Sequence, residues 1–544
     1  MSIQQPFLAH SIVALAGLYM VDQDAAKFGY KTKHELSERH ADIAREYSRE
    51  SLDEISVANI QANLILTLHQ LLSWKSLKAW VLAGIAIRHV QALRLGSEFN
   101  DRLSTRQKEV HRRTFWSCFL MDRLVSYCCS RPQMIDLETV RINLPCPESN
   151  FAFDELYDSL NLKTFSPATA AVSRTGILPF FITLLSLWGR AGYFMVGWGR
   201  IATKEAPAHA HGCFTQLDKQ INDFYDALPS SIKWSGSNLK LHRSTNQAKL
   251  FVTFHLLLNH TRFVMHQDYL PQLDSPGLEE SETAVHDNAG AAPDFNRRTI
   301  SICVSSAENI ADIISMLSSQ EPSRSVELQS AFAANAMIAA AGVHMWIRHT
   351  EGLSGQTSGI AMNRIQRTAF LISSWQFDWC VAAAWSDTIK SLGKLYDTFY
   401  HQSCNPDSIL AEASQIDIGN PSLDSDDGSV QTTGGPLHGV CEGNGVPHPD
   451  SVCQRLFDKI RFVILASLEN PDVKKRMLNS YLHTLWQHMW RYEAVQGEYR
   501  AAQLESICLD EDWMKEIALD GNIHLGPDFG LYEGNIYRTQ DNRS

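Results

Sequence analysis

Residues 109–151 read EVHRRTFWSCFLMDRLVSYCCSRPQMIDLETVRINLPCPESNF, which predicts a long helix followed by a proline-containing loop. Pro132 cannot continue a helix and disfavours helical geometry in the residue before it, so we expect the helix to end at Arg131. Residues spaced three and four apart share one face of a helix. Four residues of this stretch meet that condition: Arg112, Trp116, Phe119 and Arg123.

Charged and aromatic side chains lie close together on this predicted helix, because Phe115, Phe119 and Asp122 share a neighbouring face. This arrangement suggests guanidinium groups stacked on rings and a partly buried pairing of an arginine with Asp122. We interpret the helix as a scaffold that packs against other helices. A small-molecule or partner site on the same face is the alternative.

Helical periodicity continues through most of the chain. Apolar residues recur at three- and four-residue spacing in several segments: 64–95, 250–264, 303–317, 332–347, 456–464 and 478–489. This spacing is typical of amphipathic helices packed on one another. Sustained alternation of apolar and polar residues, which a half-exposed strand requires, is not found. The sequence therefore predicts an all-α fold, a large multi-helix domain.

Two stretches rich in Pro, Gly, Ser and acidic residues interrupt the helical pattern, and both are longer than ordinary connecting loops. The second cannot bury enough apolar surface to offset the entropy of ordering it. We expect disordered insertions in one helical body. The predicted parts are an N-terminal helical part, an insertion, a continuing body, a disordered linker, C-terminal helices and an acidic tail: residues 1–270, 271–296, 297–404, 405–450, 451–500 and 501–544.

The composition is that of a globular, weakly acidic protein, with 44% hydrophobic and 20% charged residues among 544. A formal net charge of -12 gives a surface that repels polyphosphate. The 11 cysteines include no pair two residues apart, which favours reduced cysteines over a disulfide framework. Of two long apolar stretches, 8–21 lacks the basic region of a signal peptide. Residues 176–199 could span a bilayer by length, but we favour a buried helix pair.

The order of motifs in residues 109–151 resembles the regulatory, or middle-homology, domain of fungal zinc-cluster transcription factors of the xylanolytic activator type. That family's pattern is a basic pair, Thr-Phe-Trp, Asp-Arg, Arg-Pro, and a downstream Leu-Pro with an acidic residue before an aromatic one. The matching residues here are Arg112, Arg113, Thr114, Phe115, Trp116, Asp122, Arg123, Arg131, Pro132, Leu144, Pro145, Glu148 and Phe151.

Three further segments, PFLAHSIVALAGLYM, WVLAGIAIRHVQALRLG and FHLLLNHTRFVMHQDYL, resemble other helices of the family, so the resemblance covers most of the chain. It implies a helical control domain of a nuclear transcription regulator. One departure from the family's pattern is Ser130, which stands where the family usually has glycine. Serine accepts a left-handed helix C-cap less readily than glycine does.

The resemblance implies zinc and DNA binding only through a six-cysteine cluster that normally precedes this domain. Such a cluster needs cysteine pairs two residues apart, because neighbouring thiolates must close on shared zinc ions. It is absent from this sequence, which begins a few residues before the domain. We expect either a truncated gene product or a family member that has lost DNA binding, with no cofactor in this chain.

Other candidate sites carry less weight. His209 and His211 form an HxH pair, but no neighbouring cysteine or carboxylate completes a metal site. Asp424, Asp426 and Asp427 fall in a low-complexity stretch, where solvated charges are expected rather than a magnesium site. No GxSxG, Walker A or GxGxxG motif occurs in a usable context. We therefore expect that the chain is not an enzyme and has no catalytic residues.

Two C-terminal segments each have two interpretations. The basic run 474–476 is either an import signal or a solvated helix start. The segment LESICLDEDWMKEIALD mixes acidic residues with Leu, Ile, Trp and Met, as acidic activation segments do when they bind a coactivator groove. A terminal helix docked on the domain is the alternative.

The sequence as a whole predicts a fungal transcription regulator whose partners are coregulators, a second copy in a homodimer, and DNA through the cluster of full-length relatives, with no membrane. The alternative is a cluster-less interaction protein that dimerises with or sequesters an intact transcription factor. A helical enzyme with a hydrophobic pocket is a third, weaker hypothesis. The genomic sequence upstream distinguishes the first two.

Overall fold

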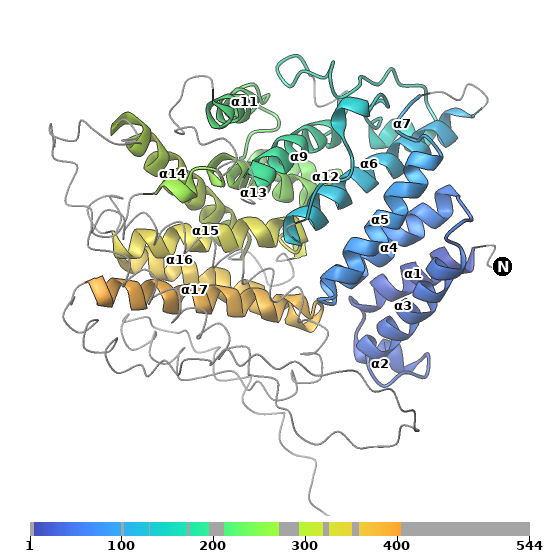
Figure 1. Cartoon of the computed structure of the whole chain (residues 1–544), viewed down its shortest axis with the longest axis horizontal. Helices are drawn as coiled ribbons and strands as arrows, with labels where there is room; N and C mark the ends of the chain where they lie inside the picture. The colour runs from blue at the N-terminus through green and yellow to red at the C-terminus, as the bar shows by residue number, and fades with distance from the viewer. Residues whose placement is uncertain are drawn as a thin grey trace, which may run out of the picture. The chain divides into compact units, whose positions relative to one another are not determined.

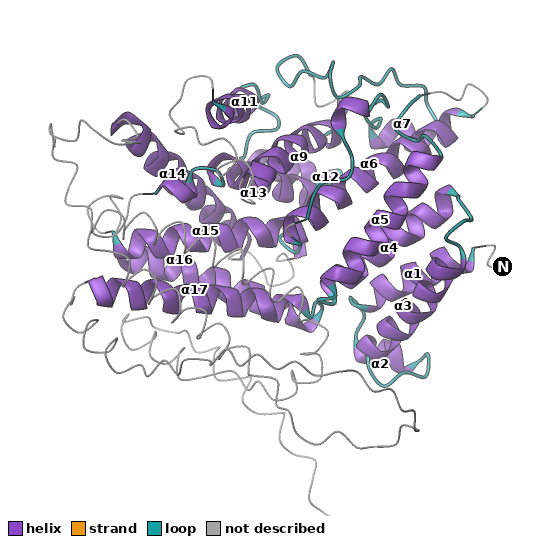
Figure 2. Ribbon diagram, viewed as in Figure 1, coloured by secondary structure: helices purple, strands orange, loops and turns teal. Residues whose placement is uncertain are grey.

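The computed structural model describes residues 5–98, 103–129, 131–170, 175–194, 212–270, 293–318, 326–350 and 358–403, and the structural statements below concern these residues. Their regular structure is helical throughout (Figure 2). An isolated antiparallel bridge between Asn143 and Asn161 is the only β pairing within these ranges. The all-α prediction is confirmed.

The α-helices in chain order are α1 (Pro6–Gly17), α2 (Asp22–Ala26), α3 (Lys33–Glu50), α4 (Val57–Leu72), α5 (Ser76–Ala92), α6 (Thr105–Cys128), α7 (Glu148–Phe153), α9 (Leu178–Tyr193), α11 (Cys213–Asp226), α12 (Gly236–Ser244), α13 (Ala248–Phe263), α14 (Pro293–Ser318), α15 (Ala331–His349), α16 (Ser358–Ser374) and α17 (Val381–Ser403). Short 3-10 turns are η1 (Leu137–Thr139), η3 (Gln267–Tyr269) and η5 (Trp375–Phe377).

Side-chain caps fix where several helices begin. Thr32, Ser56 and Ser235 each accept a hydrogen bond from the backbone N–H three residues on, at the starts of α3, α4 and α12. Ser104 and Gln107 form a reciprocal capping box at the start of α6. Such caps satisfy N–H groups that have no partner within the helix, and each stabilises a helix by about 1 kcal/mol.

The helices pack in overlapping groups (Figure 1). Helices α1, α3 and α4 contact one another, α5 packs on α4, and α6 packs on α4, α5 and α9. Helix α13 contacts α9, α11, α12, α14 and α15, and α15, α16 and α17 pack together. Helix α17 also touches α4, so helices from both ends of the described chain meet.

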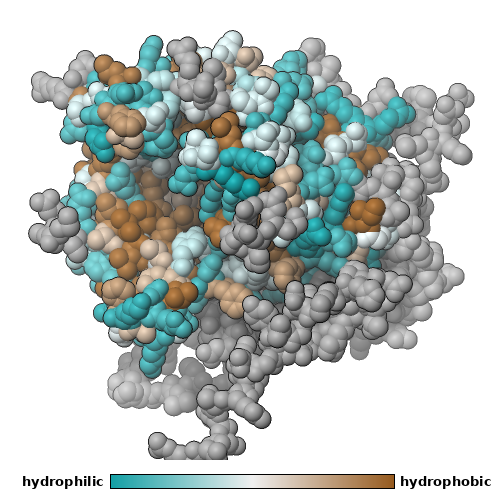
Figure 3. Space-filling model, turned by 180° about the vertical axis from the view of Figure 1, so that it is seen from behind, coloured by the Kyte–Doolittle hydropathy of each residue, from teal (hydrophilic) through white to brown (hydrophobic). Residues whose placement is uncertain are grey.

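The main hydrophobic core runs through most of these groups, from Leu18 to Ile389, and a second, smaller cluster of buried residues joins α1, α3, α4 and α5. Helices α13 and α15 are buried on almost every side, unlike a surface helix with one apolar stripe. Some apolar side chains stay exposed, and Figure 3 shows hydrophobic patches among hydrophilic residues on one face. Since the main core contains residues of α4 to α9 and also of α13 to α17, it depends on both halves of the described chain.

Three predicted element boundaries differ from those observed. Helix α6 ends at Cys128 rather than Arg131. The reason is that the chain turns early, with the Arg131 N–H donating to the Ser126 carbonyl at 2.9 Å, so the residues before Pro132 leave the helix. Helix α5 ends at Ala92, whereas the segment WVLAGIAIRHVQALRLG, which resembles a helix of the family, continues to Leu95 and Gly96. Helix α14 begins at Pro293, so residues 293–296 of the predicted insertion are helical.

The apolar stretch 176–199 contains α9, which is buried against α6, α11 and α13. Among the described residues, the segment Phe295–Ser318 of α14 is long and apolar enough to cross a membrane, although core helices pass the same test. Of its most apolar window, 56% is buried inside the protein. This packing against α13 and α15 is that of a core helix.

Candidate functional site

Trp116 connects α6 to the chain that follows it. Its indole is 1% exposed and lies edge-on to the rings of Phe115 and Phe119, with centroids 5.2 and 5.4 Å away. The indole Nε1 donates a hydrogen bond to the Asn143 carbonyl at 2.8 Å. The side chain therefore fills the core and also holds the loop after α6 in place, because a buried indole N–H needs a hydrogen-bond partner.

Asp122 and Arg123 hold the same loop further along. The Asp122 carboxylate accepts the backbone N–H groups of Met134 and Ile135 at 3.0 and 3.1 Å and pairs with the Arg123 guanidinium. Arg123 in turn donates to the Ile135 carbonyl at 2.8 Å, and its guanidinium lies 4.4 Å from the centroid of the Phe119 ring. Both the expected ion pair and the expected stacking on an aromatic ring are present.

The Asp122–Arg123 pair is fully buried, with 1% and 3% of the two residues exposed. Burial raises the pKa of Asp122, while Arg123 and the two backbone donors act in the opposite direction. Burial likewise lowers the pKa of Arg123, against the pull of Asp122. Such a pair adds little stability over apolar residues, but losing one partner leaves a buried charge and costs about 3–5 kcal/mol.

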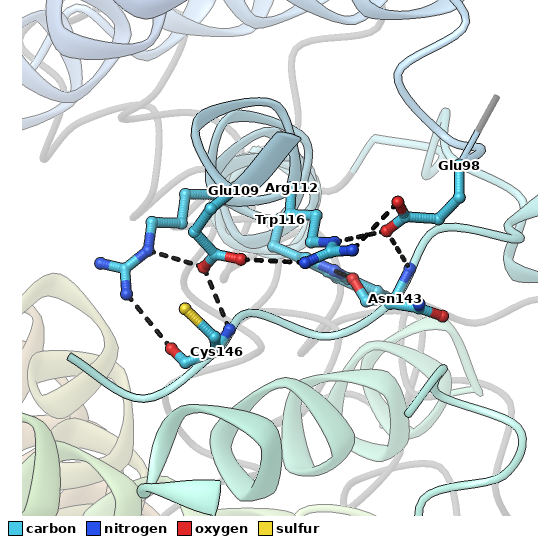
Figure 4. Close-up of polar contacts among 7 residues, drawn as sticks. Glu98, Glu109, Arg112, Trp116, Asn143 and Cys146 are labelled. Carbon is cyan, nitrogen blue, oxygen red and sulfur yellow. Dashed lines mark hydrogen bonds and ion pairs between the residues drawn. The ribbon is translucent and has the colours of Figure 1, made fainter. Parts of the chain in front are cut away.

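A second network lies at the start of α6 (Figure 4). Arg112 is paired with Glu98, which precedes the helix, and lies 3.4 Å from the Glu109 carboxylate. Glu98 and Glu109 also accept the backbone N–H groups of Asn143 and Cys146, at 3.3 and 3.0 Å. Although burial opposes its charge, these carboxylates raise the pKa of Arg112. The network thus holds three chain segments together.

Arg113 contacts the residues in the downstream part of the motif. It donates to Glu109 at 2.9 Å, to Glu148 at 2.8 Å and to the Cys146 carbonyl at 3.2 Å. Its guanidinium lies 4.2 Å from the centroid of the Phe151 ring. The acidic and aromatic residues that follow Leu-Pro in this motif are therefore partners of the second arginine of the basic pair.

The remaining motif residues position the loop backbone. The Arg131 guanidinium lies 5.7 Å from the centroid of the Trp80 ring, and the Pro132 carbonyl accepts a hydrogen bond from Ser126 at 3.2 Å. Leu144 and Pro145 are buried, and the Leu144 N–H donates to the Leu160 carbonyl at 2.8 Å. Ser130 lies outside the described residues.

We call α6 together with residues 131–151 the α6 clasp. Its charged motif residues bind backbone groups, carboxylates or rings of the same chain, although Nε of the buried Arg123 has no hydrogen-bond partner in the described structure. Sequence reasoning missed Glu98, Glu109 and Gly189. Glu109 could have been found, because it stands three and four residues before the two arginines, where helix neighbours meet.

Gly189 allows α9 to approach the clasp closely. A Cβ atom at this position would lie 2.6 Å from Cδ of Arg123 and 3.1 Å from Nε2 of Gln133. The Gly189 carbonyl also accepts a hydrogen bond from Gln133 at 2.6 Å. Gly192, one turn on, is similarly close to the Tyr127 ring. These two glycines let the α9 backbone pack directly on side chains of α6 and its loop.

Residues 2–250, which include the α6 clasp, match the sequence model of the fungal specific transcription factor domain. This part of the chain is similar to the domain that defines that family. The chain is 31% identical over 258 residues to an uncharacterized transcriptional regulatory protein of Schizosaccharomyces pombe, covering 43% of this chain and 37% of that protein. A second such protein of the same yeast is 27% identical over 280 residues, which is 47% of this chain and 29% of that protein.

A Zn(2)-C6 fungal-type transcription factor of Fusarium oxysporum is 30% identical over 231 residues, covering 36% of this chain and 23% of that factor. In these matches the chain spans between 23% and 37% of the length of its relatives. No solved structure matches the chain. The family is a class of transcription factor regulatory domains, which is not an enzyme class.

Several predicted sites lie outside the described residues: His209, His211, Asp424, Asp426, Asp427, residues 474–476 and the acidic tail. Within the described ranges, no group of three or more His, Cys, Asp or Glu side chains could hold a metal ion. The adjacent Cys128 and Cys129 contact different neighbours, the Asn335 amide and the Ser76 carbonyl, each at 3.5 Å. Burial raises the pKa of Cys128 to about 11. These thiols do not fit a zinc cluster.

One buried cluster has the order of groups found in hydrolases. Asp218 Oδ1 lies 3.1 Å from His266 Nε2, and His266 Nδ1 lies 3.1 Å from the Thr299 hydroxyl. Thr299 and His266 are 0% and 1% exposed, so the hydroxyl has no surface on which a substrate could approach. Arg298 and Asn222 also bind the Asp218 carboxylate. The cluster therefore joins α11, the end of α13 and α14 as a structural contact.

Proposed function

We propose that this chain is the helical regulatory region of a fungal transcription regulator that acts in the nucleus. The match of residues 2–250 to the fungal specific transcription factor domain supports this proposal most strongly, and similar proteins named as transcriptional regulators agree with it. DNA and zinc binding would belong to a cluster in full-length relatives. This chain would contribute contacts with coregulators or with a second copy.

The proposal has a direct test in cells. The full chain is fused to an unrelated DNA-binding domain, and transcription is measured from a reporter that carries the matching operator. A regulatory region should change transcription several-fold in either direction. An unchanged reporter, with the fusion present in the nucleus at normal abundance, would contradict the proposal.

An interaction protein that sequesters an intact relative is the second candidate. In that case the unfused chain, when co-expressed, should lower the output of an intact zinc-cluster factor by forming a complex with it. A regulator that acts only on its own promoters would leave that output unchanged, so co-purification and reporter activity separate the two candidates.

We expect the purified chain to bind zinc at well below one ion per molecule, because its cysteines include no pair two residues apart and the buried thiols of Cys128 and Cys129 face different neighbours. For the same reason, and with a net charge of -12, duplex DNA should not bind detectably at physiological salt. Elemental analysis and an electrophoretic shift assay measure the two quantities. One zinc ion or more per chain, or a sequence-specific shift, would overturn this part of the proposal.

A further inference from the structure

Helix α1 buries small residues on the face that it packs against the protein. Its buried residues recur at three- and four-residue spacing and are Phe7, Ser11, Ala14 and Gly17. Gly17 lets α3 approach closely, because a Cβ atom built there would lie 3.0 Å from the Ser37 Cβ. Through this face α1 packs on α3 and α4, at the edge of the helical body (Figure 1).

The opposite face of α1 is apolar and uncharged. Ile12 and Val13 are 49% and 36% exposed, Ala16 is exposed, and Ala9 is half-buried. These four residues lie within about 100° of one another around the helix, and we call them the α1 outer face. No Asp, Glu, Lys or Arg occurs in residues 5–21. His10 points toward α3, with its Nδ1 2.8 Å from Nδ1 of His40.

Helix α3, which packs beside α1, has the ordinary distribution of residues. All its exposed residues are charged: Glu35, Arg39, Glu46, Arg49 and Glu50. Charged side chains keep such a face in water, whereas adjoining exposed apolar residues are typical of a surface that contacts another molecule. Figure 3 shows a hydrophobic patch on the side of the molecule that carries the N-terminal helices. The contrast between the two helices indicates an interface on α1.

The α1 outer face is complementary to itself. Ala9 and Ala16 are seven residues apart and lie along its centre line, with Ile12 and Val13 on either side of that line. Read from either end, the face has an alanine, two branched side chains and an alanine. A twofold axis between Ile12 and Val13 would therefore place Ala9 against Ala16 of an antiparallel second copy. A contact of one surface with itself requires this symmetry.

The charges of the chain also favour a second copy as the occupant. Two copies that each carry a net charge of -12 repel one another least where both surfaces are uncharged. A membrane surface fits less well, because helices that lie in an anionic bilayer surface have Lys or Arg beside their apolar face, and α1 has neither. Alanines on the centre line let two helix axes approach closely, which a bilayer does not require.

We propose that this chain forms a symmetric homodimer through the α1 outer face, with the two helices antiparallel. This inference rests on the proposed function, which includes a second copy among the partners, and it names the surface that the copies share. With 12 residues, α1 is about 18 Å long. A contact of this length is smaller than a standard interface of about 1,600 Å², so the dimer should have a Kd in the micromolar range.

Sedimentation velocity of the full chain, at concentrations from about 1 to 100 µM, measures this association. The parent should shift from one chain toward two as the concentration rises. Ile12→Glu should raise the Kd at least about tenfold, because it places like charges beside the twofold axis. The control is Leu241→Glu, which makes the same change in charge at a leucine of α12 that is 54% exposed. Its Kd should match that of the parent.

A pair of variants tests the antiparallel arrangement. Ala16→Glu should weaken the dimer as Ile12→Glu does. Adding Ala9→Lys should restore the Kd to within a few-fold of the parent, because each new lysine then faces the new glutamate of the other copy. Thermal melts confirm that every variant is folded, and the Ala16 series decides the outcome if Ile12→Glu is not.

A parent chain that stays monomeric over the whole range would overturn the proposal, and so would an Ile12→Glu variant that dimerises like the parent. Failure of Ala9→Lys to improve the dimerisation of Ala16→Glu would contradict the antiparallel contact. Binding to vesicles of phosphatidylcholine and phosphatidylserine that is lost in Ile12→Glu would assign the face to a membrane instead. Each of these results leaves the reporter test of the proposed function standing, so the two proposals can fail separately.

Discussion

Trp116 is the residue at which the family motif and the stability of the fold meet. Its ring is enclosed between Phe115 and Phe119, and its N–H binds the loop backbone at Asn143. The charged residues around it bind the same loop from both ends of α6. The motif that identifies the family in sequence is thus, in this protein, a set of contacts that fix a loop of about twenty residues on one helix.

We expect Trp116→Ala to lower the free energy of unfolding by about 3–5 kcal/mol, because it leaves a cavity and an unpaired carbonyl. This is a large share of the usual margin of about 5–15 kcal/mol. The measurement is a denaturant or thermal melt beside the parent. Phe153→Ala removes a ring that is 77% exposed and should stay within about 0.5 kcal/mol of the parent.

Trp116→Ala also distinguishes a structural role of α6 from a functional one. A loss of reporter output that follows the loss of stability supports the structural role. If Trp116→Ala melts like the parent and still abolishes output, α6 is a functional surface and our interpretation of the clasp is wrong.

Helix α9 packs closely on the α6 clasp because Gly189 has no side chain. Arg123 cannot move away easily, since it is buried and bound to Asp122 and to the Ile135 carbonyl. Gly342, in the middle of α15, presents the opposite case, because a Cβ built there meets nothing within 4 Å. Substitution of Gly342 is therefore a control for substitution of Gly189.

Gly189→Ala should destabilise the protein by about 1–3 kcal/mol, since the steric cost of overpacking exceeds the gain in helix propensity. Gly342→Ala should instead stabilise it by up to about 1 kcal/mol through propensity alone. Melting temperatures of the two variants give the comparison. Two shifts of the same sign would show that the close approach of α9 to Arg123 does not govern stability.

At the scale of the whole molecule, several of the described histidines are buried in the core without charge. Burial lowers the pKa of His260 to about 3 and the pKa values of His69, His255 and His344 to about 4. His260 joins three helices, because Trp188 of α9 donates to its ring at 3.3 Å and the Tyr127 hydroxyl of α6 lies 3.3 Å away. These contacts require the neutral imidazole.

A folded pKa below the unfolded value of about 6.5 means that the unfolded chain binds more protons, so stability is full above pH 6.5 and falls as the pH drops toward 4. At pH 5.5 each of these four histidines should remove about 1.4 kcal/mol, or about 5.6 kcal/mol together. Melts at pH 7.0, 6.0 and 5.5 measure the slope. His260→Phe should make it shallower by about 1 kcal/mol, and a profile that is flat over this range would contradict the pKa shifts.

The match to the family model ends at residue 250, but the folded body does not end there. That position falls in the first turn of α13, whose residues are buried against five other helices. Phe332 of α15 also packs on the rings of Phe181 and Trp188 in α9. The second half of the described chain therefore covers the apolar face of the first.

A chain cut after residue 250 should lose cooperative unfolding and aggregate or bind hydrophobic dyes, whereas residues 1–403 should unfold cooperatively. Near-ultraviolet circular dichroism and dye binding distinguish the two forms. A well-folded, monomeric 1–250 fragment would show that the family match marks an independent domain.

The sequence by itself determined the all-α class, the positions of most helices and the motif of the α6 clasp. These features follow from local rules, namely apolar spacing, capping side chains at Ser104 and Ser56, and the break at Pro132. Even the Asp122–Arg123 pair could be predicted, because both residues lie on one helix. The position of Pro132 nevertheless predicted the end of α6 three residues too late. The Arg131 N–H donates to the Ser126 carbonyl, and the helix ends at Cys128.

Only the tertiary structure decided the partners that lie far apart in sequence. Glu98 reaches Arg112 and the Asn143 backbone, Gly189 admits Arg123, and His260 stays neutral between α6 and α9. No periodicity encodes these contacts, because they depend on which helix faces pack together. The free energy of packing the whole core selects them, and a residue's charge or pKa then follows from the place it is given.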